Sequence, residues 1–186
     1  MKAAPTVTGI FLFAALAARP AYPCLNEVMR QEEAIKMVTK VEQALEIADY
    51  NAAEVAMRTH KRIHDDKIED RLADARKLIF LRTRTDKTER EQLALVADHF
   101  KVRAKGKDVK FKAWLAESYE ALGKTEDALA ILDDLKKRDL VPDAFAYMSY
   151  ARLTAKAADR DAAVAACKVR AKNKAICVLP ANVAKS

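Results

Sequence analysis

The residues in this chain that could bind a metal are two histidines placed four positions apart. His60 and His64 would lie on one face of a helix, and Asp65 and Asp66 follow them directly. Position 61, however, is Lys and not the Glu that follows the first His in metalloprotease helices, and a lysine there repels a cation. We therefore interpret the histidines as packing residues and expect neither a metal nor a cofactor.

Other signatures of catalysis are missing from the sequence. A Gly-rich phosphate loop is excluded, because the whole chain holds three glycines. There is no Gly-x-Ser-x-Gly elbow, and serine occurs only at Ser118, Ser149 and Ser186. Acidic residues are numerous but dispersed as on a solvated surface, so no pair of them is singled out. We expect a protein that is not an enzyme.

Two of the three cysteines are close in the sequence. Nine residues separate Cys167 from Cys177, enough for the chain to turn back on itself. A disulfide closing so short a loop would contribute about 2–3 kcal/mol in the chain-entropy model and would fasten the C-terminal tail. The alternative is two separate thiols, one of them a core residue. We predict the Cys167–Cys177 disulfide, with Cys24 outside it.

The N-terminus has the pattern of a secretory signal peptide. Lys2 precedes an apolar run from Thr6 to Ala18, which is too short to span a bilayer. Ala15-Leu16-Ala17 gives the small-x-small pattern that a signal peptidase recognises, and residues 19–23 form an extended spacer with two prolines. A buried N-terminal helix is the alternative. We assign 1–23 to signal peptide and spacer, and expect a periplasmic or extracellular protein.

A lipid anchor on Cys24 is not expected. A lipoprotein cysteine follows a small residue and has Leu three positions before it, whereas Pro23 and Ala21 occupy those positions. Pairing of Cys24 with a partner or a second copy remains open.

The remainder of the chain, residues 24–186, is predicted to be entirely helical. Good helix formers dominate, and apolar residues recur at helical spacing, as at Trp114, Leu115, Tyr119 and Leu122. The net charge of the whole chain is +7, but the two signs are interleaved and form no one-sided basic face with aromatics. This argues against nucleic-acid binding.

A repeat appears when pairs of helices are aligned. Apolar residues of the first helices lie at intervals of 34, 41 and 35, at Val41, Ala75, Ala116 and Ala151. In the second helices the intervals are 40, 35 and 35, at Ala53, Leu93, Ala128 and Ala163. One insertion, in the polar loop Arg82 to Glu89, accounts for both long intervals.

This period and pattern resemble the tetratricopeptide repeat family. The third unit carries the resemblance best, with small Ala116 and Ala128, large Tyr119 and Leu132, and Gly123 at the turn. Ala48 and Ala158 stand at the glycine position of the first and fourth units, and the second unit is the weakest match. The resemblance covers roughly residues 34–170 and implies about four helix-turn-helix units stacked as a right-handed superhelix, with a C-terminal capping tail. An unrelated helical bundle is the alternative.

The resemblance also implies a function. Arrays of this family are scaffolds whose concave groove receives a peptide, helix or loop of another protein. In this register the groove residues would be Glu42, Glu46, Arg76, Phe80, Lys110, Glu117, Glu120, Arg152 and Lys156. The Asn positions of the family's carboxylate clamp are here Glu or Arg, so a partner segment with both charge signs is expected instead. The alternatives are a structural subunit of an envelope complex and an exported enzyme with an unfamiliar site.

The signal-peptide assignment can be tested directly. We predict that exported protein begins after Ala17 or Ala18, because the small-x-small pattern lies there at the end of the apolar run. N-terminal sequencing of the secreted chain checks this. A lipid-bearing start at Cys24 would contradict it.

Overall fold

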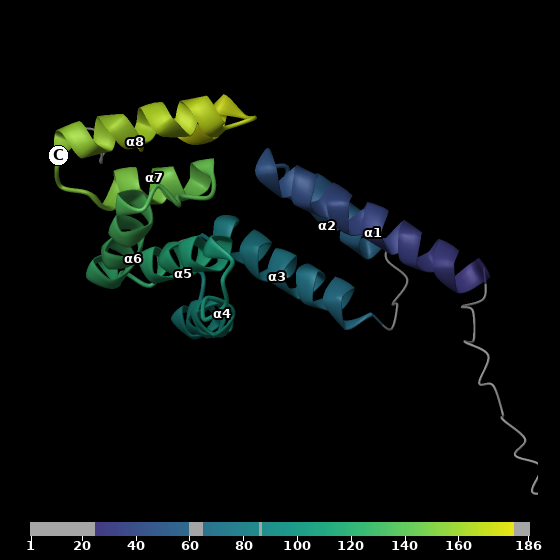
Figure 1. The fold of residues 1–186 in the computed structure, drawn as a ribbon. Coiled ribbons are helices and arrows are strands. Elements are labelled where there is room, and N and C mark those ends of the chain that lie inside the picture. Colours follow the sequence, from purple (N-terminus) through teal and green to yellow (C-terminus); the bar gives the residue numbers. More distant parts are fainter. Residues whose placement is uncertain (1–24, 60–64, 86, 181–186) are drawn as a thin grey trace, which may run out of the picture.

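The structure, a computed structural model, describes residues 25–59, 65–85 and 87–180, and all regular structure in them is helical (Figure 1). The described residues form eight α-helices and one 3-10 helix: α1 Leu25–Glu46, α2 Tyr50–Arg58, α3 Asp66–Arg82, α4 Arg90–Arg103, α5 Val109–Ala121, α6 Thr125–Lys137, α7 Ala144–Leu153, α8 Ala157–Arg170 and η1 Lys174–Cys177. The predicted all-α class is confirmed. The predicted signal peptide and spacer, Cys24 and the pair His60 and His64 lie outside the described residues.

Three helices are followed by a residue in the left-handed backbone conformation. Gly123 follows α5 with φ of 73°, as its turn position predicted, while Ala48 after α1 and Asp139 after α6 have φ of 61° and 52°. In each case the next N–H bonds back to the carbonyl five residues earlier, as in Lys124 to Tyr119 at 2.8 Å. Ala48 thus adopts the conformation for which glycine is usual, and the steric clash of its Cβ costs about 1–2 kcal/mol.

Aspartates cap two of the helix starts. Asp143 caps α7 by accepting from the Ala146 N–H at 2.9 Å. Asp49, which follows the left-handed Ala48, caps α2 by accepting from the Ala52 N–H. Helix α6 begins at Thr125 and has no side-chain cap.

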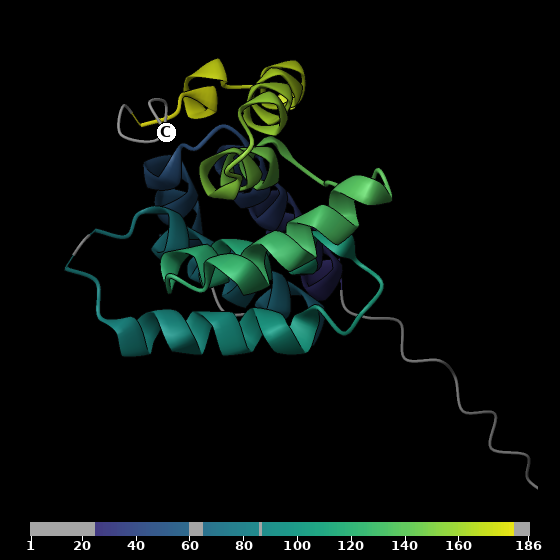
Figure 2. The same ribbon diagram turned by 90° about the vertical axis from the view of Figure 1, so that its left-hand side faces the viewer.

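Three of the four predicted helix pairs pack as pairs. Helix α1 lies against α2, α5 against α6 and α7 against α8. The second pair is different: α3 barely contacts α4, and α4 packs instead along α5. The connection between α3 and α4, residues 83–89, is the predicted insertion, and its length lets α4 move away from α3. Figures 1 and 2 show the result, with α4 at one end of the molecule and α8 with η1 at the other.

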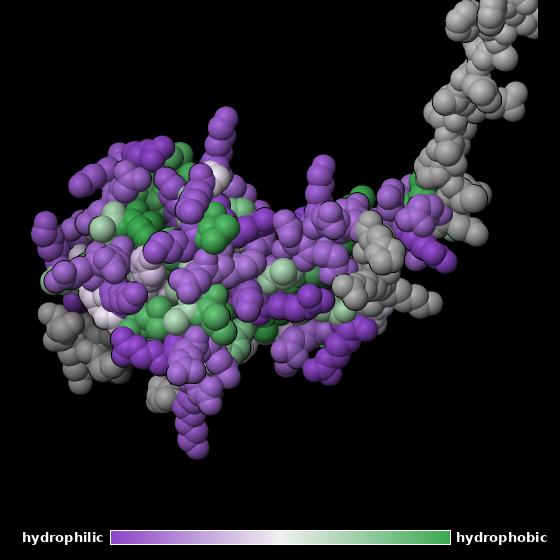
Figure 3. Space-filling view, turned by 90° about the horizontal axis from the view of Figure 1, so that it is seen from below, coloured by the Kyte–Doolittle hydropathy of each residue, from purple (hydrophilic) through white to green (hydrophobic). Residues whose placement is uncertain are grey.

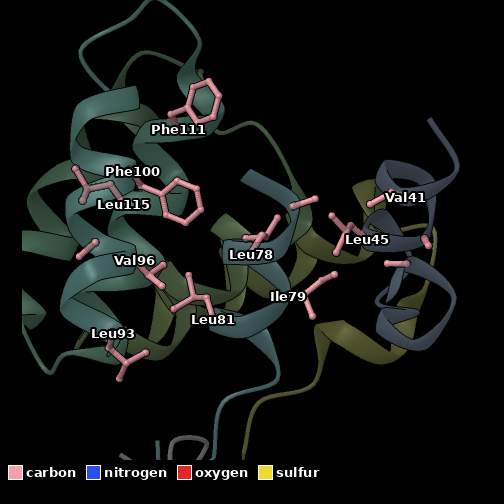
Figure 4. Packing of buried hydrophobic residues seen from close by; sticks show 14 of the residues in the cluster. Val41, Leu45, Leu78, Ile79, Leu81, Leu93, Val96, Phe100, Phe111 and Leu115 are labelled. Carbon is pink, nitrogen blue, oxygen red and sulfur yellow. The ribbon is translucent and has the colours of Figure 1, made fainter. Parts of the chain in front are cut away.

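The odd-numbered helices form a continuous layer. Each of them contacts the next one in the series, from α1 through α3 and α5 to α7. All eight positions of the aligned repeat are buried in or beside this layer: Val41, Ala53, Ala75, Leu93, Ala116, Ala128, Ala151 and Ala163. Small residues at these positions let neighbouring helices approach closely. Larger side chains such as Leu78, Leu81 and Phe100 fill the space between α3, α4 and α5 (Figure 4).

The C-terminal tail folds back on the last helix pair. Cys167 in α8 and Cys177 in η1 form a disulfide with a Cα–Cα distance of 5.8 Å, which confirms the predicted pair. Cys167, Ala171 and Cys177 pack against Ala144 and Met148 of α7. The tail therefore covers the outer side of α7 and α8, as a terminal cap must.

The closeness of α5 and α6 can be tested at Ala128, which is fully buried. We predict that Ala128→Leu overpacks this contact and lowers the free energy of unfolding by about 1–3 kcal/mol. Ala130→Leu, at an exposed position of the same helix, is the control and should change it by less than about 0.5 kcal/mol. Urea unfolding followed by circular dichroism measures both. Equal effects of the two substitutions would contradict the packing described here.

Candidate binding cavity

A cavity of about 730 Å³ lies on the face formed by the odd-numbered helices. Its walls come from α1, α3, α5, the start of α7 and the segment that follows α8. The lining residues are Glu42, Leu45, Glu46, Arg71, Asp74, Ala75, Leu78, Arg82, Lys110, Trp114, Pro142, Asp143, Ala144, Phe145, Arg170, Ala171 and Lys172. This volume lies within the range of sites that hold small ligands or a few side chains of a partner, about 300–1,000 Å³.

The floor of the cavity is apolar and aromatic. Trp114, the only tryptophan of the chain, packs edge-on against Phe111 with the ring centroids 5.2 Å apart, and its centroid lies 5.5 Å from that of Phe100. Its indole Nε1–H is buried and has no hydrogen-bond partner in the described residues. A buried donor left unpaired costs about 1–3 kcal/mol. Trp114 is therefore held by ring packing and not by a polar contact.

A buried ion pair borders this floor. Arg82 at the end of α3 donates two hydrogen bonds to Glu117 of α5, from Nε at 3.0 Å and from Nη2 at 2.8 Å. Both side chains are only 6% exposed. Burial raises the pKa of Glu117, and the guanidinium of Arg82 acts against that rise. The carboxylate therefore depends on Arg82 for its charge.

The same guanidinium also reaches the start of α7. It lies 3.6 Å from the ring centroid of Phe145, a cation–π contact, and 3.9 Å from the Asp143 carboxylate. Asp143 is at the same time the N-cap of α7. Arg82 thus joins α3, α5 and α7 at one point beside the cavity.

A second ion pair lies one turn further along α5. Glu120 accepts from Arg152 of α7 at 2.5 Å and 2.9 Å, and its side chain is 11% exposed. The Arg152 pKa is raised, because the two hydrogen bonds and the charge of Glu120 outweigh the opposing effect of burial. Glu117, Glu120 and Arg152 therefore hold helices together and present no free charge to a ligand.

Carboxylates at the rim are also paired. Glu42 accepts two hydrogen bonds from Arg71 at 3.0 Å and 2.6 Å. Asp74 binds Arg103 at 2.6 Å and lies 2.8 Å from His99 Nε2. All four carboxylates of the wall have a cationic partner, and the lining residues include no Ser, Thr, Cys or His. The wall therefore consists of apolar and charged side chains, without a hydroxyl, thiol or imidazole group.

One wall is made by contact between the C-terminal end of α1 and the segment that follows α8. Lys172 pairs with Glu46, and Asn173 Nδ2 donates to the Ile47 carbonyl at 2.9 Å, across 126 residues of sequence. Arg170 donates to the Val141 carbonyl and lies 5.0 Å from the ring centroid of Tyr147. The family resemblance implies a concave groove; in the structure the tail returns to the end of α1 and bounds the cavity on that side.

The structure places the predicted groove residues in four different settings. Glu42, Glu46 and Lys110 line the cavity. Arg76 and Phe80 line a separate shallow hollow together with Met57 and Thr83. Glu117, Glu120 and Arg152 form the ion pairs described above, and Lys156 is exposed at the start of α8.

The separation of α3 from α4 explains why Arg76 and Phe80 lie elsewhere. The face of α3 turned to the cavity carries Arg71, Ala75, Leu78 and Arg82, spaced three or four residues apart. Arg76 lies about 100° around the helix from Ala75, which turns it towards α2. Sequence reasoning also missed Phe145 and residues 170–172; no local pattern marks them, because tertiary contacts alone bring them here.

Comparisons with protein-family models, curated proteins and solved structures find no match for this chain. None of the helices in the described residues is both long and apolar enough to cross a membrane. The assignment of function therefore depends on the cavity itself.

The buried pair gives a sharp stability test. We predict that Arg82→Met lowers the free energy of unfolding by about 3–5 kcal/mol, because it leaves Glu117 buried without its cation. Arg82→Met combined with Glu117→Met should recover most of this loss, since two apolar side chains then replace the pair. Thermal and urea unfolding of both variants measures the difference.

Arg71→Met is the matched control for Arg82→Met. It breaks the pair with Glu42, whose side chains are 37% and 42% exposed, and should cost at most about 1 kcal/mol. If Arg82→Met proved no more damaging than Arg71→Met, the central role of the buried pair would be wrong.

Proposed function

We propose that this chain is an exported, non-enzymatic scaffold of the tetratricopeptide-like type, which binds a short segment of another protein in the cavity. The observation that carries the proposal is the cavity's composition: an aromatic and aliphatic floor inside a rim of mostly paired charges, without Ser, Thr, Cys or His among its lining residues. Binding sites combine an apolar interior with a few polar groups that fix orientation in this way. The right-handed superhelical stacking of four units belongs to the same proposal.

The size and rim of the cavity limit the partner. About 730 Å³ holds one or two large side chains of a loop or extended segment, not the whole side of a helix. The rim carries both charge signs, with Glu42 and Glu46 from α1 and Lys110 from α5. A partner segment with both signs around an apolar anchor complements this arrangement.

Export is supported by the cysteines. The Cys167–Cys177 disulfide is of the kind that persists in an oxidising compartment and is rare in the cytosol. The predicted signal peptide agrees with it, although those residues lie outside the described part of the chain.

The proposal is tested by selecting ligands from a random peptide library displayed on phage. Peptides that bind the cavity should shift the fluorescence of Trp114, the chain's only tryptophan, which lines it. Lys110→Glu reverses one rim charge and should change the affinity of these peptides by about two- to fivefold. Fluorescence titration and calorimetry measure both effects.

Lys101→Glu is the control, because Lys101 is exposed on α4 and is not part of the cavity lining. It should leave peptide affinity unchanged. Peptides that bind without altering Trp114 fluorescence, and that ignore Lys110→Glu, would place the binding site elsewhere. A library that yields no binder would count against a peptide-binding role.

A further inference from the structure

The chain contains the same pentapeptide twice, at the ends of two helices. Lys-Val-Arg-Ala-Lys occupies 101–105 at the end of α4 and 168–172 at the end of α8. The first copy lies among carboxylates: Arg103 binds Asp70 at 2.9 Å and Asp74 at 2.6 Å. The second copy lies inside the disulfide loop, residues 168–176, which we call the basic loop. One sequence is thus placed in two electrostatic environments.

The basic loop carries four cations and no acid. Lys168, Arg170, Lys172 and Lys174 are the only charged residues between 162 and 180, and all four are exposed. Among the described residues, the one ion pair that any of them makes is the exposed contact of Lys172 with Glu46. Arg170 and Lys174 donate to backbone carbonyls instead. The loop therefore keeps a concentrated positive charge, which attracts an anionic partner.

Exposed apolar side chains flank these cations. Val169 is 83% exposed and Val178 is 70% exposed, the two highest values among the large hydrophobic residues that the structure describes. The disulfide between Cys167 and Cys177 holds the segments of both valines together. A rigid, disulfide-closed loop loses little conformational freedom when it binds.

We propose that the basic loop docks on the surface of an anionic phospholipid membrane. Lipid phosphates would accept hydrogen bonds from the four cations, and each basic residue near such a surface gains about 1 kcal/mol, or roughly fivefold in affinity. Val169 and Val178 would enter the boundary between headgroups and hydrocarbon, which an acidic polypeptide does not offer. Arg170 and Lys172 also belong to the cavity wall, but Lys168, Lys174, Val169 and Val178 do not, so the proposal does not depend on peptide binding in the cavity.

The test is sedimentation of the full chain with vesicles of phosphatidylcholine, with and without 30% phosphatidylglycerol, at rising salt. Binding to the anionic vesicles should be stronger and should fall as salt rises. Lys168→Gln with Lys174→Gln should weaken it about 20- to 30-fold, since two charges are removed. Val169→Ser should weaken it about three- to tenfold, because a buried apolar group is lost.

The first pentapeptide supplies the matched controls. Lys101→Gln with Lys105→Gln, and Val102→Ser at a side chain that is 66% exposed, should leave binding unchanged. The apolar run Thr6 to Ala18 is common to all variants, so its contribution cancels in the comparison. Circular dichroism confirms that the surface variants remain folded.

Three results would overturn the proposal. One is vesicle binding that is indifferent to the basic-loop variants. Another is an equal loss from the substitutions in residues 101–105, which would indicate attraction by total charge. The third is capture of the loop by poly-glutamate, insensitive to Val169→Ser and without vesicle binding, which would indicate an acidic protein partner.

Discussion

Arg82 connects three helices that are distant in the sequence. Its guanidinium is bonded to Glu117 in α5, lies over Phe145 and is close to Asp143 at the start of α7, while its backbone ends α3. Taking a charge out of water costs several kcal/mol, so the arrangement is stable only while every one of these partners is in place. The orientation of the odd-numbered layer, and with it the shape of the cavity, depends on this point.

The charges of the molecule fall into two classes as a result. Arg82, Glu117, Glu120 and Arg152 are largely buried and fix the angles between helices. The exposed pairs at the rim, such as Arg71 with Glu42, contribute little to stability. A mixed-sign sequence thus serves structure on the inside of the layer and supplies the charges of the proposed binding site at its edge. On the side of α4, shown in Figure 3, the surface is mostly hydrophilic and its hydrophobic areas are separate and small.

The sequence predicts the packing positions well because these depend on local rules. Ala116 and Ala128 belong to adjacent helices joined by a short turn, so their spacing alone fixes their contact. The same rule fails for Arg76, because it assumes that α3 and α4 pack as a pair, whereas the inserted loop releases α4 to pack along α5. Glu117 was expected in the groove and lies on the correct face of α5, but no local pattern shows that Arg82 covers it. Local rules likewise do not predict the wall formed by Lys172 and Asn173, because Glu46 and Ile47, which these residues contact, are 126 residues away in the sequence.

The return of the tail to α1 also limits how this architecture can change in size. An open stack of repeats can gain or lose a unit at little cost, because each unit contacts only its neighbours. Here an additional helix pair would carry Asn173 away from Ile47 by about one helix spacing, 8–10 Å, and would break the contact. The cavity is therefore bounded only with this number of units, just as the number of strands determines the diameter of a closed barrel. Relatives that arose by duplication of a unit would have an open face in place of the cavity.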